Sequence, residues 1–337
     1  MNIRSFHIVP VALSVIAALA TGCSSVSSTP PSSPAQADLQ LTDITVAALP
    51  AADLAGLYIA LDDGLFTRQG LRVTVEPIAS SQAIIDEQLK GRVDVSAGSY
   101  IPYIAAQAAG ARFHILAQAS TLKPDTRVLV TTANSPITTI GQLAGKTIGV
   151  NGTNSIGTLL ISILLFDHGI SPAKVRLVTD PAGFPAMPAQ LQERTWSAAF
   201  LAEPYITEAG EQYGDRILAD MDQGSAVDFP VDGYVATTAW VQQNPKAAAA
   251  FVRAILAAQL IADTDSAAVQ AAIAKHDNLG PQVMAAMALS GYPAGPVTEG
   301  PIETVAQAML QFGLLGRQYA AVVDQGSLVA SMVRPVA

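Results

Sequence analysis

Six short polar residues stand where predicted strands end, and their side chains suit the binding of a small polar solute. Serine, threonine and asparagine side chains can cap a helix N-terminus, and they can also donate hydrogen bonds to a ligand. For any single residue, capping alone is an equally good explanation. Six at equivalent corners of a repeated unit indicate a binding site: Ser80, Ser81, Ser99, Thr153, Asn154 and Ser155. Aromatic walls could come from Tyr58, Tyr100, Tyr103, Phe184 and Tyr205, although any one of these is more often part of a core.

Charged residues near the same loops favour two opposite kinds of ligand. Asn151, Thr153, Asn154 and Ser155 should open a helix near Ile156, where unpaired backbone N–H groups favour an anion. Of the arginines in the sequence, only Arg127, at the first of the two strands expected to connect the lobes, can be placed near this cleft. Four carboxylates would instead repel an anion or attract an amine: Asp53, Asp180, Glu203 and Asp232. A zwitterion such as an amino-sulfonate satisfies both sets, with its acidic head at residues 151–155 and its amine toward Glu203 or Asp53.

No pattern in the chain indicates a reaction. Its four histidines are His7, His114, His168 and His276, and none lies in a strand-end loop. The zinc-protease, nucleophile-elbow, P-loop and dinucleotide-loop motifs are absent from the sequence. The single cysteine excludes an intramolecular disulfide and a cysteine-based metal cluster. The sequence therefore predicts no catalytic residue, no metal site and no cofactor.

The elements that must position these residues form a repeated unit. Residues 44–103 predict strands 44–49, 71–77 and 93–97, separated by helices 54–63 and 82–90. A shift of 104 positions places Leu71-Arg72-Val73 on Val175-Arg176-Leu177, and Glu76-Pro77 on Asp180-Pro181. Short apolar strands that alternate with helices predict parallel, doubly wound α/β sheets, in which ligands bind at the carboxyl ends of the strands.

Length and composition fit two lobes of this build. The chain has 337 residues, of which half are hydrophobic and 13% charged, and its net charge of −9 argues against nucleic acid. We expect a first lobe at residues 41–130, a second at 131–234, and a helical return to the first at 235–337. Apolar runs at 128–132 and 231–238 should pair and cross between the lobes as a hinge. Later helices are predicted from Pro245 onward and at 266–275, 281–289 and 302–315.

The first residues indicate export. Residues 1–22 read as a signal peptide, with Arg4 before an apolar stretch too short to span a membrane comfortably. Cys23 follows directly, in Leu19-Ala20-Thr21-Gly22-Cys23, and the chain to residue 40 is a flexible tether rich in serine and proline. This resembles the lipobox of bacterial lipoproteins, although the family prefers leucine at Ala20. Simple secretion, with cleavage after Ala20, is the alternative.

Several short sequence motifs, in their order along the chain, resemble those of the solute-binding proteins of ABC importers. The branch is the nitrate, sulfonate and taurine type, which is related to binders of thiamine-pyrimidine precursors. Gly64-Leu65-Phe66 and Gly70-Leu71 match that branch's "G-L-F-x-x-x-G-L" phrase. Further similarities are Gly91-Arg92-Val93-Asp94, residues 143–150, Glu203-Pro204 and Asn244-Pro245. The resemblance covers residues 41–320.

The resemblance implies a two-lobed periplasmic-binding-protein fold of type II and no enzymatic activity. It also implies a monomeric lipoprotein, anchored at Cys23 on the extracytoplasmic face of the cell membrane, that delivers a small solute to a permease and its ATPase. Three alternatives stay open. The solute could be a thiamine-pyrimidine precursor or another amine-bearing molecule. The chain could be an enzyme like the pyrimidine synthases, but their cysteine-rich motif is absent. It could also report its ligand to a membrane sensor kinase.

Overall fold

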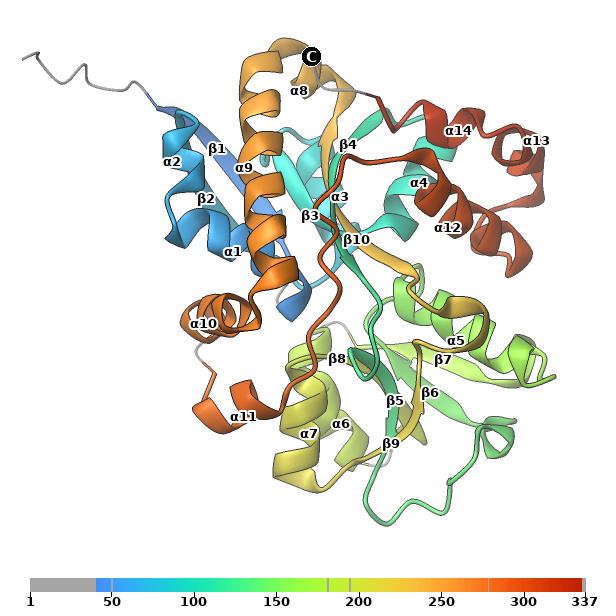
Figure 1. Cartoon of the computed structure of the whole chain (residues 1–337). Helices are drawn as coiled ribbons and strands as arrows, with labels where there is room; N and C mark the ends of the chain where they lie inside the picture. Colours follow the sequence, from blue (N-terminus) through green and yellow to red (C-terminus); the bar gives the residue numbers. More distant parts are fainter. Residues whose placement is uncertain (1–40, 50, 181, 194, 278, 335–337) are drawn as a thin grey trace, which may run out of the picture. The chain divides into compact units, whose positions relative to one another are not determined.

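The computed structural model describes residues 41–49, 51–180, 182–193, 195–277 and 279–334. These residues lie in one compact unit, Gln40–Ala337. The expected signal peptide, Cys23 and the tether lie outside the described residues. Two five-stranded sheets, one in each lobe, form the framework of the unit (Figure 1).

The first sheet has the strand order β2-β1-β3-β10-β4. Strands β1 and β2 are parallel, as are β1 and β3, whereas β10 runs antiparallel to both of its neighbours. The strands are β1 (Thr42–Ala48), β2 (Leu71–Pro77), β3 (Val95–Ser99), β4 (Phe113–Thr121) and β10 (Pro230–Thr237).

The second sheet repeats this plan with the order β7-β6-β8-β5-β9, and here β5 is the antiparallel strand. The strands are β5 (Arg127–Thr131), β6 (Thr147–Val150), β7 (Arg176–Thr179), β8 (Ala198–Ala202) and β9 (Arg216–Asp220). Thr42 pairs with Leu71 and Thr147 with Arg176, so the two lobes share one register at this position. The duplication seen in the sequence is confirmed, but both sheets are mixed and not wholly parallel.

The expected pairing of the two crossing runs is wrong. Strand β5 pairs with β8 and β9 of the second sheet, and β10 pairs with β3 and β4 of the first. The lobes are joined instead by residues 122–126 and 221–229, where Leu122 N donates to Phe229 O over 2.9 Å. The expected lobe boundaries at residues 130 and 234 therefore fall inside β5 and β10, each of which belongs entirely to one sheet. Apolar, β-branched runs predict strands but do not identify their partners.

Helices cover both faces of each sheet (Figure 1). The first lobe contains α1 (Ala55–Asp62), α2 (Leu65–Arg68), α3 (Ser81–Leu89) and α4 (Tyr100–Ala108). The second contains α5 (Ile156–Asp167), α6 (Met187–Gln192) and α7 (Tyr205–Tyr213). The C-terminal part contains α8 (Thr238–Gln243), α9 (Pro245–Thr264), α10 (Ser266–Asp277), α11 (Pro281–Ala286), α12 (Glu299–Gln311), α13 (Ala320–Asp324) and α14 (Ser327–Ala330).

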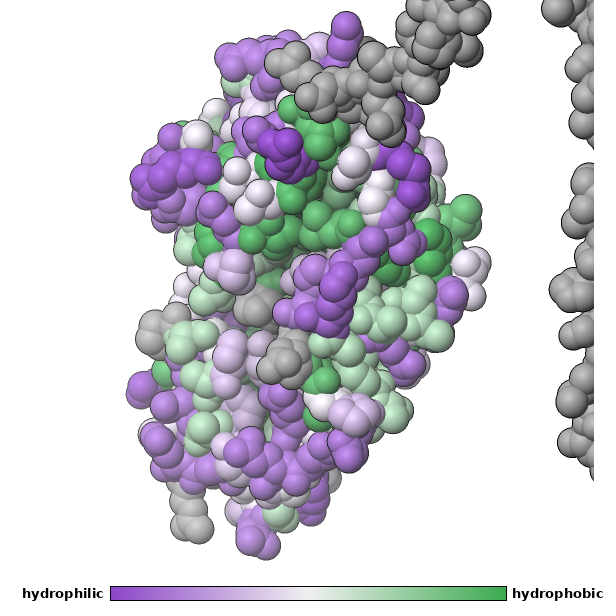
Figure 2. Space-filling model, turned by 90° about the vertical axis from the view of Figure 1, so that its left-hand side faces the viewer, coloured by the Kyte–Doolittle hydropathy of each residue, from purple (hydrophilic) through white to green (hydrophobic). Residues whose placement is uncertain are grey.

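The longest helix, α9, is part of the core of the first lobe. Pro245 occupies its first turn, a position where the missing N–H costs nothing. Its buried Phe251 stacks on Phe66 and meets the edge of Tyr234 in β10. By length and composition α9 could cross a membrane, yet it packs here against α1 and β4. Figure 2 shows that hydrophobic side chains reach the surface mainly in the upper half of that view, while hydrophilic ones cover most of the lower half.

The segment after α11 departs from the prediction of a helix up to residue 289. Helix α11 ends at Ala286, and residues 287–292, here called the strap, reach both lobes. Ala288 N donates to the Glu203 carboxylate of the second lobe over 3.1 Å. Gly291 forms a β-bridge with Thr121 at the end of β4. The strap therefore adds a third polypeptide contact between the lobes.

Candidate ligand-binding site

A cavity of about 240 Å³ lies where the carboxyl ends of strands from both sheets face each other. This is the location that the fold predicts for a ligand. The cavity is lined by Leu49, Ser80, Ser81, Gln82, Ser99, Arg127, Asn151, Gly152, Thr153, Asn154, Ser155, Ile156, Thr179, Asp180, Phe184 and Asp232. It therefore brings together ten of the twelve polar and charged residues that the sequence placed near the cleft, all but Asp53 and Glu203, and it leaves out Tyr100.

Three helices, α3, α4 and α5, begin at the cavity, and each has a serine at its N-cap. The serine hydroxyl oxygens accept backbone hydrogen bonds from the first turns, so these serines cap their helices and line the cavity as well. The bonds run from Ala83 N to Ser80 (3.2 Å), from Ile101 N to Ser99 (3.4 Å) and from Thr158 N to Ser155 (3.4 Å).

The caps leave other first-turn N–H groups of α3, α4 and α5 without a partner in their own helix. Those donors and the aligned peptide dipoles contribute a positive potential at the helix ends, which favours an anion there. Ser81 joins two of the helices, because its hydroxyl oxygen accepts from Ser99 N over 3.2 Å. The helix ends come from both lobes, so an anion placed among them would attract the lobes to each other.

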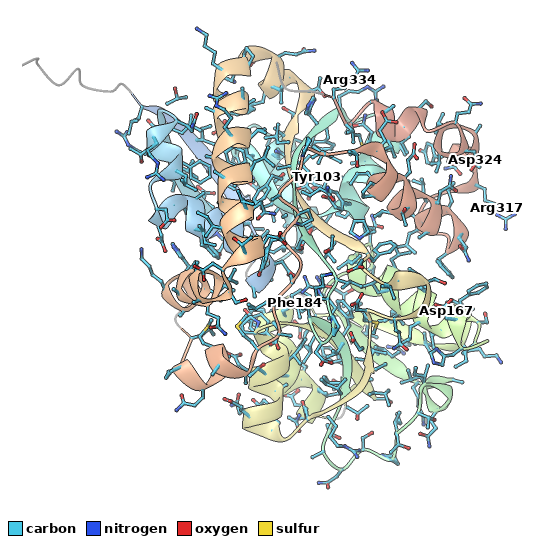
Figure 3. The ribbon with its side chains drawn as sticks, in the orientation of Figure 1. Tyr103, Asp167, Phe184, Arg317, Asp324 and Arg334 are labelled. Atoms are coloured by element: carbon cyan, nitrogen blue, oxygen red, sulfur yellow. The ribbon has the colours of Figure 1, made fainter. Side chains whose placement is uncertain are left out.

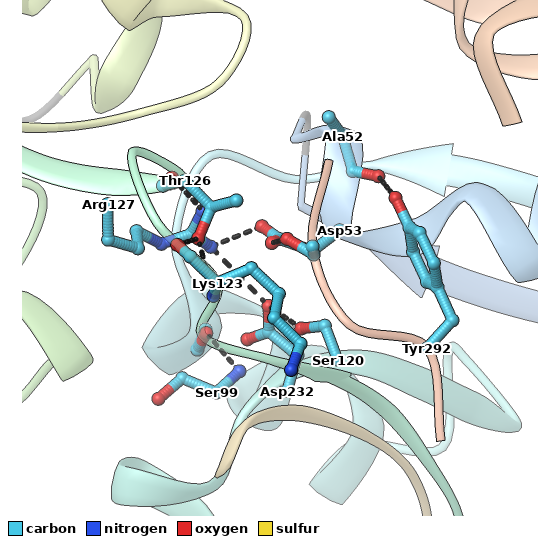
Figure 4. A network of polar contacts seen from close by, with 11 residues as sticks. Ala52, Asp53, Ser99, Ser120, Lys123, Thr126, Arg127, Asp232 and Tyr292 are labelled. Atoms are coloured by element: carbon cyan, nitrogen blue, oxygen red, sulfur yellow. Dashed lines mark hydrogen bonds and ion pairs between the residues drawn. The ribbon is translucent and has the colours of Figure 1, made fainter. Parts of the chain in front are cut away.

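A buried ion cluster forms the hinge end of the cavity (Figure 4). Arg127, from β5, forms an ion pair with Asp53 and lies 3.6 Å from Asp232 Oδ2 on β10. The other Asp53 oxygen accepts from the Ser290 hydroxyl of the strap over 2.6 Å, and Ser120 donates to Asp232 over 3.4 Å. All three charged side chains are almost fully buried. The cluster joins the first lobe, the second lobe and the strap.

Two carboxylates share one arginine, and the pKa of Asp232 reflects this. Burial, helped by the negative charge of Asp53, raises the pKa of Asp232 to about 7, against the opposite effects of Arg127 and of the Ser120 hydrogen bond. Burial alone would lower the pKa of Arg127, but Asp53 and Asp232 raise it, so the guanidinium stays charged. Asp232 can therefore gain or lose a proton near neutral pH.

Glu203 and Asp53 do not face the cavity. The Glu203 carboxylate accepts from Thr207 N (3.1 Å), from the Thr207 hydroxyl (2.9 Å) and from Ala288 N of the strap. Burial raises the pKa of Glu203, although these hydrogen bonds act against it. Glu203 thus binds the start of α7 to the strap, and Asp53 neutralises Arg127.

Tyr100 is fully buried under β10, and a Cβ placed on Gly233 would meet its ring at 2.4 Å. It packs inside the lobe and does not line the cavity. The aromatic wall is Phe184, whose ring centroid lies 5.9 Å from the Arg127 guanidinium carbon. Figure 3 shows Phe184 near the centre of the molecule, where the lobes meet.

Sequence reasoning missed three polar groups of the site. Gln82 and Thr179 line the cavity, and each stands at a strand end or first helical turn, the signal that identified its neighbours. Ser290 directly follows the helix predicted at 281–289, and nothing near it in sequence indicates a contact with Asp53. Among the described residues, no group of three or more His, Cys, Asp or Glu side chains is placed to hold a metal ion.

The two lobes, each with a five-stranded mixed sheet, and the cavity between them define a protein of the periplasmic-binding-protein fold. The chain belongs to the NMT1/THI5-like family, whose model matches residues 51–265. No curated protein matches the chain.

Several solved structures share the fold. The alkanesulfonate-binding protein SsuA from Xanthomonas axonopodis pv. citri, bound to MOPS, aligns at a TM-score of 0.68 and 17% identity, over 82% of this chain and 95% of that one. The periplasmic nitrate-binding protein NrtA from Synechocystis PCC 6803 aligns at 0.69 and 17%, over 87% and 88%. The desulfurization enzyme DSZB aligns at 0.61 and 18%, over 86% and 98%.

Proposed function

We propose that the protein is the extracytoplasmic solute-binding component of an ABC importer, which captures a small solute between its lobes and presents it to a permease. It is a binding protein and not an enzyme. The observation that carries the proposal is the convergence of three helix N-termini, from both lobes, on one cavity of about 240 Å³. The family and the sulfonate- and nitrate-binding proteins of the same fold support it.

The solute that fits best is a small amino-sulfonate. Its sulfonate would lie at residues 151–155 and the ends of α3 and α4, where backbone donors and serine hydroxyls surround an anion. Glu203 and Asp53 are engaged inside the protein, so we do not place the amine on either of them. The acidic groups that do line the cavity are Asp180 and Asp232.

A thiamine-pyrimidine precursor is the second candidate. The observation that favours it is the Phe184 ring in the cavity wall, which offers a face on which a planar heterocycle could stack. The match to the NMT1/THI5-like family is compatible with this class as well.

A thermal-shift panel of sulfonates, nitrate, bicarbonate, pyrimidines and amines tests the function. A ligand at 100 times its Kd adds about 2.7 kcal/mol to the free energy of unfolding, and each kcal/mol raises the Tm by roughly 2–4 °C at this size. We expect the largest shift with taurine. Thr153→Tyr, which fills the cavity, should abolish the shift, whereas Thr138→Tyr, at an exposed site outside it, should not. No shift with any compound would contradict the proposal, and a shift with pyrimidines alone would favour the second candidate.

A further inference from the structure

Four buried polar atoms of residues that line the cavity find no hydrogen-bond partner among the described residues. They are Arg127 Nε, Asn151 Oδ1, Thr179 Oγ1 and Asp232 Oδ1. A buried polar atom without a partner costs free energy, and such atoms at one cavity describe the groups that an occupant must bring. Arg127 Nε needs a hydrogen-bond acceptor, whereas Asp232 Oδ1 needs a hydrogen-bond donor.

Asp232 has the strongest requirement of the four. It is 2% exposed, and its Oδ2 already receives the Ser120 hydroxyl and faces Arg127, which leaves Oδ1 free. Arg127 cannot fully compensate its charge, because Asp53 takes the same Nη2 group more closely. An unpaired carboxylate oxygen at this depth needs either a proton or a cationic donor from the ligand.

The other groups around Asp232 do not supply that donor. Burial raises the pKa of Tyr100, Tyr103 and Tyr234, so their hydroxyls keep their protons, but none of these hydroxyls has a hydrogen-bond partner among the described residues. Lys123, which is also drawn in Figure 4, pairs with Asp228 at the surface over 2.6 Å. Asp180 lines the same cavity and is a further acidic group. Glu203 lies farther away and interacts electrostatically with Arg127. The titratable and charged neighbours are Asp53, Arg127, Tyr100, Tyr103 and Tyr234.

We propose that Asp232 determines specificity: it accepts a hydrogen bond from a cationic amine of the solute, and it must itself take up a proton when the solute lacks one. This inference rests on the proposed function, and it assigns the amine of the ligand to the hinge end of the cavity. The solute is then a zwitterion whose anionic head lies at the helix N-termini and whose amine lies at β10.

If the proposal is right, the affinities of two matched ligands, taurine and ethanesulfonate, change in opposite directions as the pH rises. A cationic amine binds ionised Asp232, so the affinity for taurine should fall about tenfold per pH unit below pH 7 and level off above it. Ethanesulfonate has the same skeleton without the amine and needs protonated Asp232. Its affinity should fall above pH 7 by a similar factor. Between pH 6 and pH 8 the ratio of the two affinities should change at least tenfold.

Isothermal titration from pH 6 to pH 8, in buffers of different ionisation enthalpy, measures both the affinities and the protons exchanged. Near pH 7 taurine should release protons and ethanesulfonate should take them up. Asp232→Asn should flatten both profiles and weaken taurine at least tenfold at pH 8. Asp228→Asn, an exposed aspartate outside the cavity, and Glu203→Gln should keep the wild-type preference. The wild-type profiles need no variant, so a misfolded Asp232→Asn would leave the test intact.

Parallel pH profiles for the two ligands would overturn the role of Asp232 while leaving the proposed function in place, since sulfonates would still bind. Failure of both ligands to bind at any pH would remove the amino-sulfonate assignment and this inference together. Opposite proton exchange that persists in Asp232→Asn would also overturn it, because another group would then be the one that titrates.

Discussion

At the scale of single residues, Arg127 holds the site together by pairing closely with Asp53 and less closely with Asp232. It balances Asp53 directly and Asp232 in part, and all three lie away from water. Removing one member of such a cluster leaves a buried charge without compensation. Because most of the charge of Arg127 is balanced inside the cluster, the helix N-termini are the main groups that attract an anion.

We therefore expect Arg127→Gln to lower the free energy of unfolding by about 3–5 kcal/mol, since Asp53 is left buried and unpaired. Adding Asp53→Asn should recover part of the loss. Urea unfolding of the four proteins in this double-mutant cycle measures the coupling. Arg72→Gln is the matched control, because its pair with Asp43 is exposed and should matter by less than about 1 kcal/mol. Strictly additive losses would show that the Arg127–Asp53 pair is not coupled.

At the scale of elements, the loop before α6 closes the site from the second lobe. Gly183 has φ +69°, and a Cβ there would lie 2.9 Å from the Ala79 carbonyl oxygen of the first lobe. Ala52 N also donates to Glu203 O across the lobes over 3.3 Å. The two lobes are thus in backbone contact at these two points, and position 183 leaves room for no residue larger than glycine.

Gly183→Ala should weaken ligand binding about tenfold or more, because the added methyl group opposes closure of the lobes. Scattering in solution should show a smaller radius of gyration for ligand-saturated wild type, and a smaller change for the variant. Gly169→Ala is the control: its φ is +70°, but no heavy atom lies within 4 Å of the new Cβ. Equal affinities for wild type and Gly183→Ala would show that this contact does not limit closure.

What the sequence could predict follows from how local each signal is. Ser80, Ser99 and Ser155 were identifiable because strand period and N-cap preference act within a few residues. The roles of Glu203 and Asp53 were not, since Ala288 and Ser290 reach them from 85 and 237 positions away. The partners of β5 and β10 were missed for the same reason: pairing between strands is set by the whole sheet and not by the run itself.

At the scale of the whole molecule, the proposed attachment to a membrane concerns residues outside the described part of the chain. Cys23 directly follows the predicted signal peptide, and two or more acyl chains hold a protein at a bilayer far more firmly than one. The full-length protein should partition into the detergent phase on extraction, and Cys23→Ala should move to the aqueous phase or stay unprocessed. A Ser24→Ala control should behave as wild type. Aqueous partitioning of both wild type and Cys23→Ala would point to simple secretion.

The return of the chain to the first sheet, through β10, imposes an order on the assembly of the protein. All five strands of the second sheet lie within residues 127–220, so that sheet can form from one continuous stretch of polypeptide. The first sheet needs β10 between β3 and β4, and this position, next to the edge strand β4, stays empty until residues 230–237 have emerged. During synthesis or export, the lobe that begins first is therefore the lobe that is completed last, and its strands must wait with two unpaired edges while the other lobe folds.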